Sequence, residues 1–257
     1  MKKTVMSRGR FRKIVREFFR TNRRDFSWRP PELRLRKNGA AAEPYRVFVS
    51  EVMLQQTQVA RVAEKYGAFL KTFPDFRALA KAPLARVLRA WQGLGYNRRA
   101  LQLRGAAEEI IRIYGGVIPH EREKLEALPG IGPATARSIR AFAFNEPEVF
   151  VETNIRSVYL HFFFPRSKNI PDKKLLPLIE KTLGRKNPRE WYYALMDYGS
   201  PLKKNGTNPS RRSASHIIQK KFKGSIRETR GAVIRLLLKQ SASLPEMQNA
   251  LGLEPKK

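Results

Sequence analysis

The chain has 257 residues and carries 52 Lys and Arg against 22 Asp and Glu, a formal net charge of +30. This excess is far beyond what solubility requires and predicts a polyanionic partner. No apolar run approaches the roughly 20 residues that span a bilayer, and no signal-peptide core follows Met1, so nucleic acid is a better partner than a membrane. The absence of cysteine excludes disulfides and cysteine-ligated metal sites, and the three histidines lack ligand spacing. We therefore expect a cytoplasmic, nucleoid-associated protein with no metal and no cofactor.

The hydrophobic residues recur mainly with helical periodicity, and this predicts an all-α fold. A hydrophobic content of 42% is sufficient for a core at this chain length. A strand pattern appears only at residues 149–151, which is too short to start a sheet. The predicted helices, in chain order, are Arg10–Arg20, Tyr45–Leu54, Gln58–Thr72, Asp75–Lys81, Leu84–Ala90, Arg98–Tyr114, Glu121–Ala127, Pro133–Phe144, Asn154–Phe163, Lys173–Leu183, Glu190–Tyr198, Arg227–Gln240 and Leu244–Leu251.

Two longer segments are predicted to be irregular. Residues Pro30–Pro44 form a polar stretch that we interpret as an insertion before the second helix. Residues Lys203–Arg212 form a basic, turn-rich stretch.

The second predicted helix carries the most informative motif, Ser-Glu-Val-Met-Leu-Gln-Gln-Thr-Gln at residues 50–58. Glu51 stands among apolar neighbours, and three amide side chains of the type that reads base edges follow it. If Glu51 faces inward, desolvation raises its pKa and lets it hold a proton at neutral pH. The alternative is a solvated surface glutamate, which is the usual location of this residue type.

A second motif, Leu-Pro-Gly-Ile-Gly-Pro-Ala-Thr-Ala at residues 128–136, predicts a tight hairpin between two helices. Pro133 suits the first turn of the following helix. The amides at this helix start, with the positive end of the helix dipole, are suited to bind a phosphate oxygen. We predict phosphate binding at Gly130, Gly132 and Thr135, with an ordinary helix connection as the alternative.

These motifs, together with Gly-Leu-Gly-Tyr at residues 93–96 and Val-Glu-Thr-Asn at residues 151–154, follow one another as in the helix-hairpin-helix base-excision DNA glycosylases. Within that superfamily the chain most resembles the MutY adenine glycosylase branch, over about residues 10–200. The resemblance implies two helical lobes with double-stranded DNA bound in the cleft between them and one purine turned out of the base stack. It implies a lobe of residues 1–44 and 145–222, a six-helix lobe of residues 45–144 that contains the hairpin, and a small helical extension of residues 223–257.

The resemblance also implies roles for individual residues. Glu51 matches the family's general acid, which protonates the adenine, and Glu152 with Asn154 matches the second catalytic element. The other implied residues are Trp28, Arg29 and Tyr193 around the extruded base, Gln56 and Thr57 at the site of intercalation, and Leu94 and Tyr96 beside the opposing base, where the family reads 8-oxoguanine.

The chain departs from the family at several of these positions. Glu152 replaces the family's aspartate, and one extra methylene can cost about 10²-fold in rate where geometry is tight. Tyr193 replaces an acidic or amide side chain near the base, which leaves the identity of the base open. The family's four cluster cysteines align with Lys203, Ser210, Ser213 and Gln219, so we expect packing and hydrogen bonds to hold this loop.

Ala134 occupies the position at which bifunctional relatives such as endonuclease III carry a Schiff-base lysine. We therefore predict a monomeric, monofunctional glycosylase that removes adenine opposite 8-oxoguanine or guanine from mismatched or damaged duplex DNA. Two alternatives stay open: the same scaffold directed at uracil, thymine, hypoxanthine or a damaged purine, and a lesion-binding protein without catalysis.

Overall fold

The computed structural model describes residues 6–29, 44–204, 208–218 and 221–252. Most of the predicted insertion before the second helix lies outside the described residues. So do residues 205–207 of the basic stretch, and Gln219, one of the positions that align with the cluster cysteines. The regular elements of the described residues are all helices; there is no strand, and one isolated β-bridge joins Ile170 and Ser213. The predicted all-α class is confirmed.

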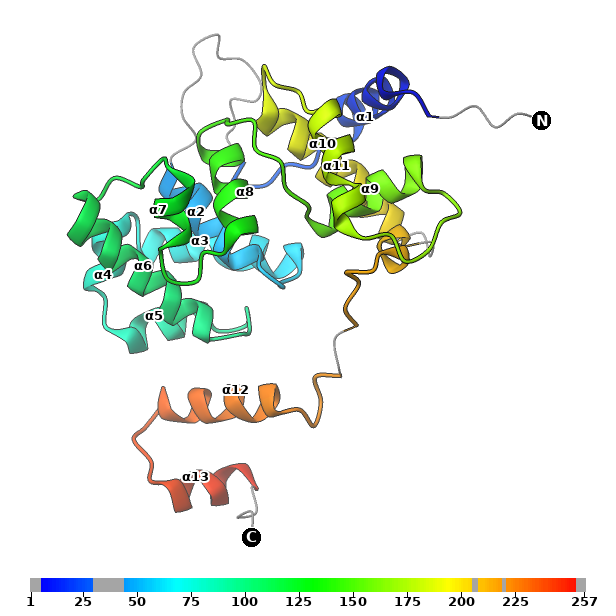
Figure 1. Cartoon of the computed structure of the whole chain (residues 1–257). Helices are drawn as coiled ribbons and strands as arrows, with labels where there is room; N and C mark the ends of the chain where they lie inside the picture. Colours follow the sequence, from blue (N-terminus) through cyan, green and yellow to red (C-terminus); the bar gives the residue numbers. More distant parts are fainter. Residues whose placement is uncertain (1–5, 30–43, 205–207, 219–220, 253–257) are drawn as a thin grey trace. The chain divides into compact units, whose positions relative to one another are not determined.

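The chain divides into two compact units. The first comprises residues 1–51, 119–127 and 131–217, and the second comprises residues 52–118, 128–130 and 218–257. The helices of the first unit are α1 (Arg8–Asn22), most of α2 (Pro44–Leu54), α7 (Arg122–Glu126), α8 (Pro133–Ala143), α9 (Thr153–Phe163), η2 (Asp172–Lys174), α10 (Leu176–Thr182), α11 (Pro188–Lys204) and η3 (Pro209–Arg212) (Figure 1). Those of the second are α3 (Val59–Thr72), α4 (Phe76–Lys81), α5 (Leu84–Trp91), α6 (Arg98–Tyr114), α12 (Ile226–Leu237) and α13 (Leu244–Leu251) (Figure 1).

These units do not follow the lobe boundaries expected from the sequence. The expected division assigns α8 to the lobe of residues 45–144, whereas in the structure α8 packs on α7 and α11 in the first unit. The division into lobes for DNA binding stays a prediction.

The core of the first unit forms where α1 and α9 pack on α11. The ring of Phe11 on α1 is fully buried and lies about 5–6 Å from four other aromatic rings; these belong to Tyr159, Phe162, Phe163 and Trp191. Helices α9 and α11 approach closely because Gly199 has no side chain. A Cβ at Gly199 would lie 2.5 Å from the Asn154 carbonyl oxygen, so only glycine fits. This approach fixes the start of α9 against α11.

Two predicted helices differ from the observed ones. The single helix predicted over Lys173–Leu183 is instead the 3-10 turn η2 followed by α10, because Pro177 lacks an amide hydrogen and cannot continue a helix from Lys173. The helix predicted to end at Tyr198 continues to Lys204 through Gly199 and Pro201. The packing of Gly199 on α9 outweighs the low helix propensity of these two residues.

A buried arginine organises the second unit. The guanidinium group of Arg99 donates to five backbone oxygens and one hydroxyl, at 2.6–3.1 Å. The acceptors are the carbonyl groups of Val52, Met53, Gln55, Leu94 and Gly95 and the Thr57 hydroxyl. Burial lowers the pKa of Arg99 to about 10, and the positive charge is compensated by the carbonyl dipoles at the C-terminal end of α2. Arg99 thus joins the segment after α2 to the segment before α6.

We predict that Arg99→Ala lowers the free energy of unfolding by at least about 3 kcal/mol, because several buried carbonyl groups lose their donor at roughly 1–3 kcal/mol each. The neighbouring exposed Arg98 is the matched control, and Arg98→Ala should change stability by less than about 0.5 kcal/mol. Urea denaturation of both variants measures the difference. Equal effects of the two substitutions would contradict the role given to Arg99.

Candidate active site

The residue at the centre of the site is Glu51 on α2. This helix is buried on almost every side, with Phe48, Val49 and Met53 fully inaccessible to solvent. A helix that is apolar on all sides is typically buried in a hydrophobic core. Helix α2 therefore places the Glu51 carboxyl group among apolar side chains. The Glu51 side chain keeps partial exposure, as a group that must reach a ligand requires.

Burial raises the pKa of Glu51 from 4.5 to about 7. Desolvation of the charged form is the main cause. A hydrogen bond with the buried Ser138 hydroxyl lowers the pKa, and the nearby negative charge of Glu152 raises it. Glu51 is therefore a carboxyl group that is about half protonated near neutral pH, which is the state a general acid needs.

Glu152 is placed by the start of α9, where it is the residue that caps the helix. Its Oε2 atom accepts from the Asn154 amide at 2.7 Å, and its Oε1 atom accepts from Asn154 Nδ2 at 3.1 Å. The longer glutamate side chain thus folds back over the helix start and lies in the positive field of the helix dipole. Its charge acts on Glu51, so the structure places the two predicted carboxylates near each other within one unit.

Tyr193 on α11 is buried near Glu51. Its ring stacks on Phe142 with centroids 4.7 Å apart, and the Arg29 guanidinium lies over it, 4.4 Å from the ring centroid. Burial raises the pKa of the Tyr193 hydroxyl; the Arg29 charge lowers this pKa, and the Glu51 charge raises it. The hydroxyl is therefore a neutral group near Glu51, in contrast to the acidic or amide side chain of the resembled family.

Arg29 is fixed by an acid that the sequence reading did not select. Its Nη1 and Nη2 atoms each donate to Asp197 at 2.8 Å, and the Asp197 side chain is fully buried. Arg24 donates to the same carboxylate from its backbone amide at 3.0 Å and from Nε at 2.6 Å. Trp28, between these arginines, is buried and stacks on Phe26 with centroids 4.6 Å apart. The segment that carries Trp28 and Arg29 is thereby attached to α11, one turn from Tyr193. The signal that could have revealed Asp197 is an acid inside an otherwise apolar stretch of helix.

The four residues predicted to intercalate or read the opposing base lie in the second unit. Gln56 and Tyr96 are exposed and adopt positive φ angles of 52° and 49°, a strained conformation for these residue types. The Thr57 hydroxyl contacts the Leu94 carbonyl at 3.3 Å and accepts from Arg99 at 2.8 Å. The side chain of Leu94 is only 2% exposed, which argues against direct reading of a base by that side chain. Arg99, which the sequence analysis did not single out, donates to Thr57 and to the Leu94 carbonyl and lies over the Tyr96 ring, 5.7 Å from its centroid.

The predicted hairpin is present between α7 and α8. Gly130 has a φ of 78°, and a Cβ there would lie 2.8 Å from Gln102 Cβ, so glycine is required. Its carbonyl accepts from Gln55 Nε2 at 3.2 Å. Gly132 caps α8, and a Cβ added there would meet no atom within 4 Å. Pro133 is the first residue of α8, and Thr135 lies in its first turn. Phosphate binding by this hairpin stays a prediction.

The loop that aligns with the cluster cysteines is held by hydrogen bonds and packing, as expected. Ser210 and Ser213 are both buried, and Ser213 Oγ contacts the Ile170 carbonyl at 3.2 Å. Arg212 donates to the carbonyl of Leu160 at 3.0 Å and to that of Phe164. Burial lowers the pKa of Lys203, which is opposed by the nearby charge of Glu152. The described residues contain no group of three or more His, Cys, Asp or Glu that could hold a metal ion.

None of the helices in the described ranges is long and apolar enough to cross a membrane.

Comparison with known proteins identifies the family. The model of the HhH-GPD superfamily base excision DNA repair proteins matches residues 49–183, which include Glu51, the hairpin and Glu152. This chain belongs to that family.

Curated relatives that match the chain include several proteins named adenine DNA glycosylase. The protein from Buchnera aphidicola subsp. Baizongia pistaciae is 35% identical over 61% of this chain and 45% of its own length. The Mycolicibacterium smegmatis protein is 43% identical over 53% of this chain and 43% of its own length. The Homo sapiens protein is 32% identical over 75% of this chain and 36% of its own length. The chain thus spans less than half the length of these relatives, which fall in the branch that the sequence motifs predicted.

Solved structures with the same fold include a thymine-DNA glycosylase and an endonuclease III–DNA complex. A thermostable thymine-DNA glycosylase superimposes with a TM-score of 0.62 at 26% identity, over 75% of this chain and 86% of that chain. A trapped endonuclease III–DNA covalent intermediate superimposes with a TM-score of 0.54 at 20% identity, over 76% of this chain and 85% of that chain, and supports the fold alone.

The raised pKa of Glu51 predicts a pH-dependent stability. The folded protein binds this proton more tightly than the unfolded chain, so the contribution of Glu51 to stability falls as the pH rises from about 4.5 to about 7. Above pH 7 the ionised group costs roughly 3 kcal/mol, at about 1.4 kcal/mol per pH unit. Glu51→Gln should therefore stabilise the protein more at pH 8.5 than at pH 5, as measured by urea denaturation.

The exposed Glu180 on α10 provides the control, and Glu180→Gln should show no such pH dependence. If Glu51→Gln changed stability equally at the two pH values, Glu51 would not be a desolvated carboxyl group.

Proposed function

We propose that this protein is a DNA N-glycosylase that excises adenine mispaired with 8-oxoguanine or guanine in base excision repair. The observation that carries the proposal is a carboxyl group with a pKa near 7, Glu51, close to a second carboxylate, Glu152, in the matched region of the family. The names of the curated relatives support adenine as the base. The protein acts as a monomer on double-stranded DNA that holds a mismatch or lesion, in the cytoplasm and associated with the nucleoid.

The two carboxylates have different tasks in the proposed reaction. Glu51 donates its proton to a ring nitrogen of the extruded adenine, and the bond between the base and C1′ of the sugar then breaks, with its electron pair leaving on the base. The Glu152 carboxylate stabilises the positive charge that develops on the sugar, as the second carboxylate does in retaining glycosidases. Water adds to C1′ and returns a proton to Glu51. The products are free adenine and an abasic site in an intact strand.

In the proposed reaction, Glu152 stabilises the sugar from the position that its hydrogen bonds with Asn154 give it. The hydrogen bonds from Asn154 at 2.7 and 3.1 Å restrain a side chain that has one more rotatable bond than the family's aspartate. The close approach of Gly199 to Asn154 restrains Asn154 in turn. Asn154 is thus the positioning residue for Glu152.

The protein is proposed to lack lysine-dependent strand cleavage. Ala134, an exposed residue in the first turn of α8, cannot form a Schiff base with the sugar. Incubation with substrate and borohydride should trap no covalent adduct. A trapped adduct would contradict this part of the proposal, and Lys203, near Glu152, would be the first lysine to replace by alanine.

A second candidate is the same chemistry directed at another base. The similarity to a thermostable thymine-DNA glycosylase and the presence of Tyr193 beside Glu51 favour it. Tyr193 is a neutral, buried hydroxyl group and presents a different hydrogen-bonding pattern to the base from an acid.

One assay separates the candidates. Duplexes that contain adenine opposite 8-oxoguanine, adenine opposite guanine, thymine opposite guanine or uracil opposite guanine are incubated with the protein and then cleaved at abasic sites with alkali. We expect product from the adenine pairs, and a loss of at least about 10²-fold in single-turnover rate for Glu51→Gln. Product from the pyrimidine pairs alone would favour the second candidate, and tight binding without any product would indicate a non-catalytic lesion-binding protein.

The charge of Glu152 predicts a shift in the pH profile of excision. Because the Glu152 charge raises the pKa of Glu51, Glu152→Gln should lower that pKa and move the falling alkaline limb of the rate to lower pH. The rate itself should fall by roughly 10²–10³-fold as the sugar loses its electrostatic partner.

The control for this profile is Glu180→Gln, which removes an exposed carboxylate of the same unit. It should change neither the pH of the alkaline limb nor the rate of excision. An alkaline limb that moved to higher pH in Glu152→Gln would contradict the proposed interaction.

A further inference from the structure

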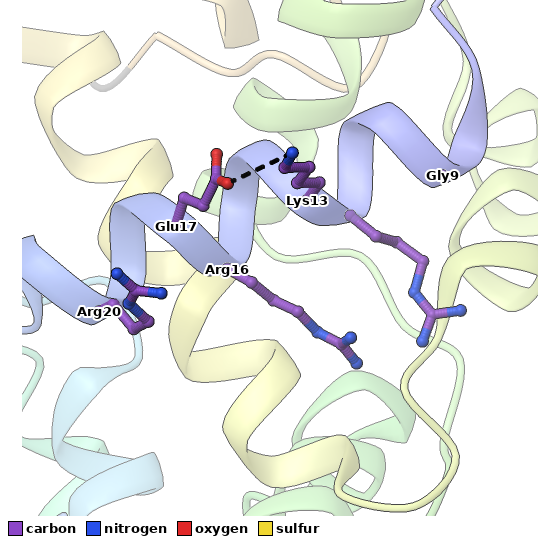
Figure 2. A pocket seen from close by; sticks show the side chains of 6 residues that line it. Gly9, Lys13, Arg16, Glu17 and Arg20 are labelled. Atoms are coloured by element: carbon purple, nitrogen blue, oxygen red, sulfur yellow. Dashed lines mark ion pairs between the residues drawn. The ribbon is translucent and has the colours of Figure 1, made fainter.

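Helix α1 carries a regular series of arginines, of which three are exposed and one, Arg12, is half-buried. Arg8, Arg12, Arg16 and Arg20 follow one another at every fourth residue, so they lie along one face of the helix; we call them the arginine ladder. Lys13 and Glu17 form an ion pair at 3.9 Å beside it, and in Figure 2 the Arg16 side chain extends away from that pair. Together with Gly9, most of these residues line a shallow surface hollow of about 380 Å³ (Figure 2).

The ladder is unfavourable for the helix itself. Like charges four residues apart destabilise a helix, and the ladder repeats this arrangement three times. The first turn contains Arg8 and Arg10 and no acid, so positive charges lie at the positive end of the helix dipole. Within the described ranges, none of the four ladder residues forms an ion pair with a carboxylate.

The neighbouring apolar face of α1 supplies the packing that holds the helix in place. Phe11 and Val15 are fully buried and Phe19 is nearly so, and Phe11 is surrounded by the aromatic rings of α9 and α11. Apart from the charge of Arg12, which acts on the buried Tyr159, the described contacts give the ladder no role in folding. A sequence that violates local helix rules in this way is expected to gain something at a functional site.

We propose that the arginine ladder binds the phosphate backbone of duplex DNA, as a contact additional to the candidate active site and the hairpin. The inference rests on the proposed function, because it takes DNA as the partner. Guanidinium groups bind phosphate oxygens through paired hydrogen bonds, and this explains arginine, in preference to lysine, at all four positions.

The geometry of a helix suits this partner. Ladder residues are separated by about 6 Å along the helix axis, and the whole helix spans roughly 22 Å. Phosphates follow one another every ~3.4 Å of rise along each DNA strand, so the helix can contact phosphates over about six base pairs. A membrane surface does not fit, because membrane-bound basic helices insert an apolar face, and the apolar face of α1 is buried inside the unit.

The test compares two triple variants in binding to an undamaged 30-base-pair duplex, measured by fluorescence anisotropy over a range of KCl concentrations. The ladder variant is Arg12→Gln, Arg16→Gln and Arg20→Gln. The control variant is Lys71→Gln, Arg77→Gln and Arg112→Gln, which removes three exposed cations from three different helices of the other unit. Both variants lose the same net charge.

We expect the ladder variant to bind about 10–100-fold more weakly at ~100 mM salt, with a salt dependence reduced by about 2–3 in log–log slope, near 0.9 for each lost phosphate contact. The control variant should keep the slope of the parent protein. An unchanged slope in the ladder variant, or equal losses in both variants, would overturn the proposal; the second result would assign the effect to net charge alone.

A second measurement separates binding from folding. Thermal unfolding at low salt should show the ladder variant to be as stable as the parent protein or more stable, because like-charge repulsion has been removed. Weaker binding together with a lowered melting temperature would instead give the ladder a structural role and overturn the proposal. Because the duplex contains no mispair, this experiment reports on the ladder alone, and failure of the proposed excision would appear separately in the base-release assay.

Discussion

The desolvation of one carboxyl group, that of Glu51, is the constraint on which the site depends. Helix α2 is among the most completely buried helices of the described chain, and it carries Glu51 at the edge of its apolar surroundings. In water this carboxyl group would be ionised at neutral pH and would have no proton to donate. Burial shifts the balance toward the protonated form, and the neighbouring charge of Glu152 moves it further in the same direction. The opposing hydrogen bond with Ser138 limits the shift, so that the group can still release its proton.

Each of the two units contains a buried ionic group that joins neighbouring segments of that unit. In the first unit, Asp197 accepts hydrogen bonds from Arg24 and Arg29 and attaches the segment after α1 to α11, beside Tyr193. In the second unit, Arg99 satisfies the carbonyl groups that follow α2 and holds the segments of Gln56 and Tyr96, both of which are strained. Strain of this kind persists only where the surrounding structure enforces it, and each of these buried groups is costly to leave unpaired. Within the first unit, restraint of this kind suits a catalytic acid, because a displacement of about 1 Å can lower a rate by about 10²-fold.

Sequence reasoning predicted the helical class and nearly all helices, because amphipathic periodicity and turn residues are local signals. It was wrong where tertiary contacts outweigh local preference, as in the continuation of α11 through Gly199 and Pro201. The motifs indicated Glu51, Glu152 and the hairpin, since each has a distinctive residue pattern. Asp197 was missed although it lies inside an otherwise apolar stretch of helix, and Arg99 was missed because it follows another arginine and its burial leaves no sign in the sequence. The exposed residues of α1 were seen only as part of a general basic excess, and their alignment on one face became evident with the helix itself.

The most direct test of this account is a titration of Glu51 by NMR in the protein without DNA, with glutamate labelled with carbon-13 at the side-chain carboxyl carbon. The Glu51 resonance is assigned by its absence from the spectrum of Glu51→Gln. The account predicts a titration midpoint near pH 7, well above those of the solvent-exposed glutamates. A midpoint between about 4 and 5 would show that Glu51 is solvated, and the proposed acid catalysis would then lack its physical basis.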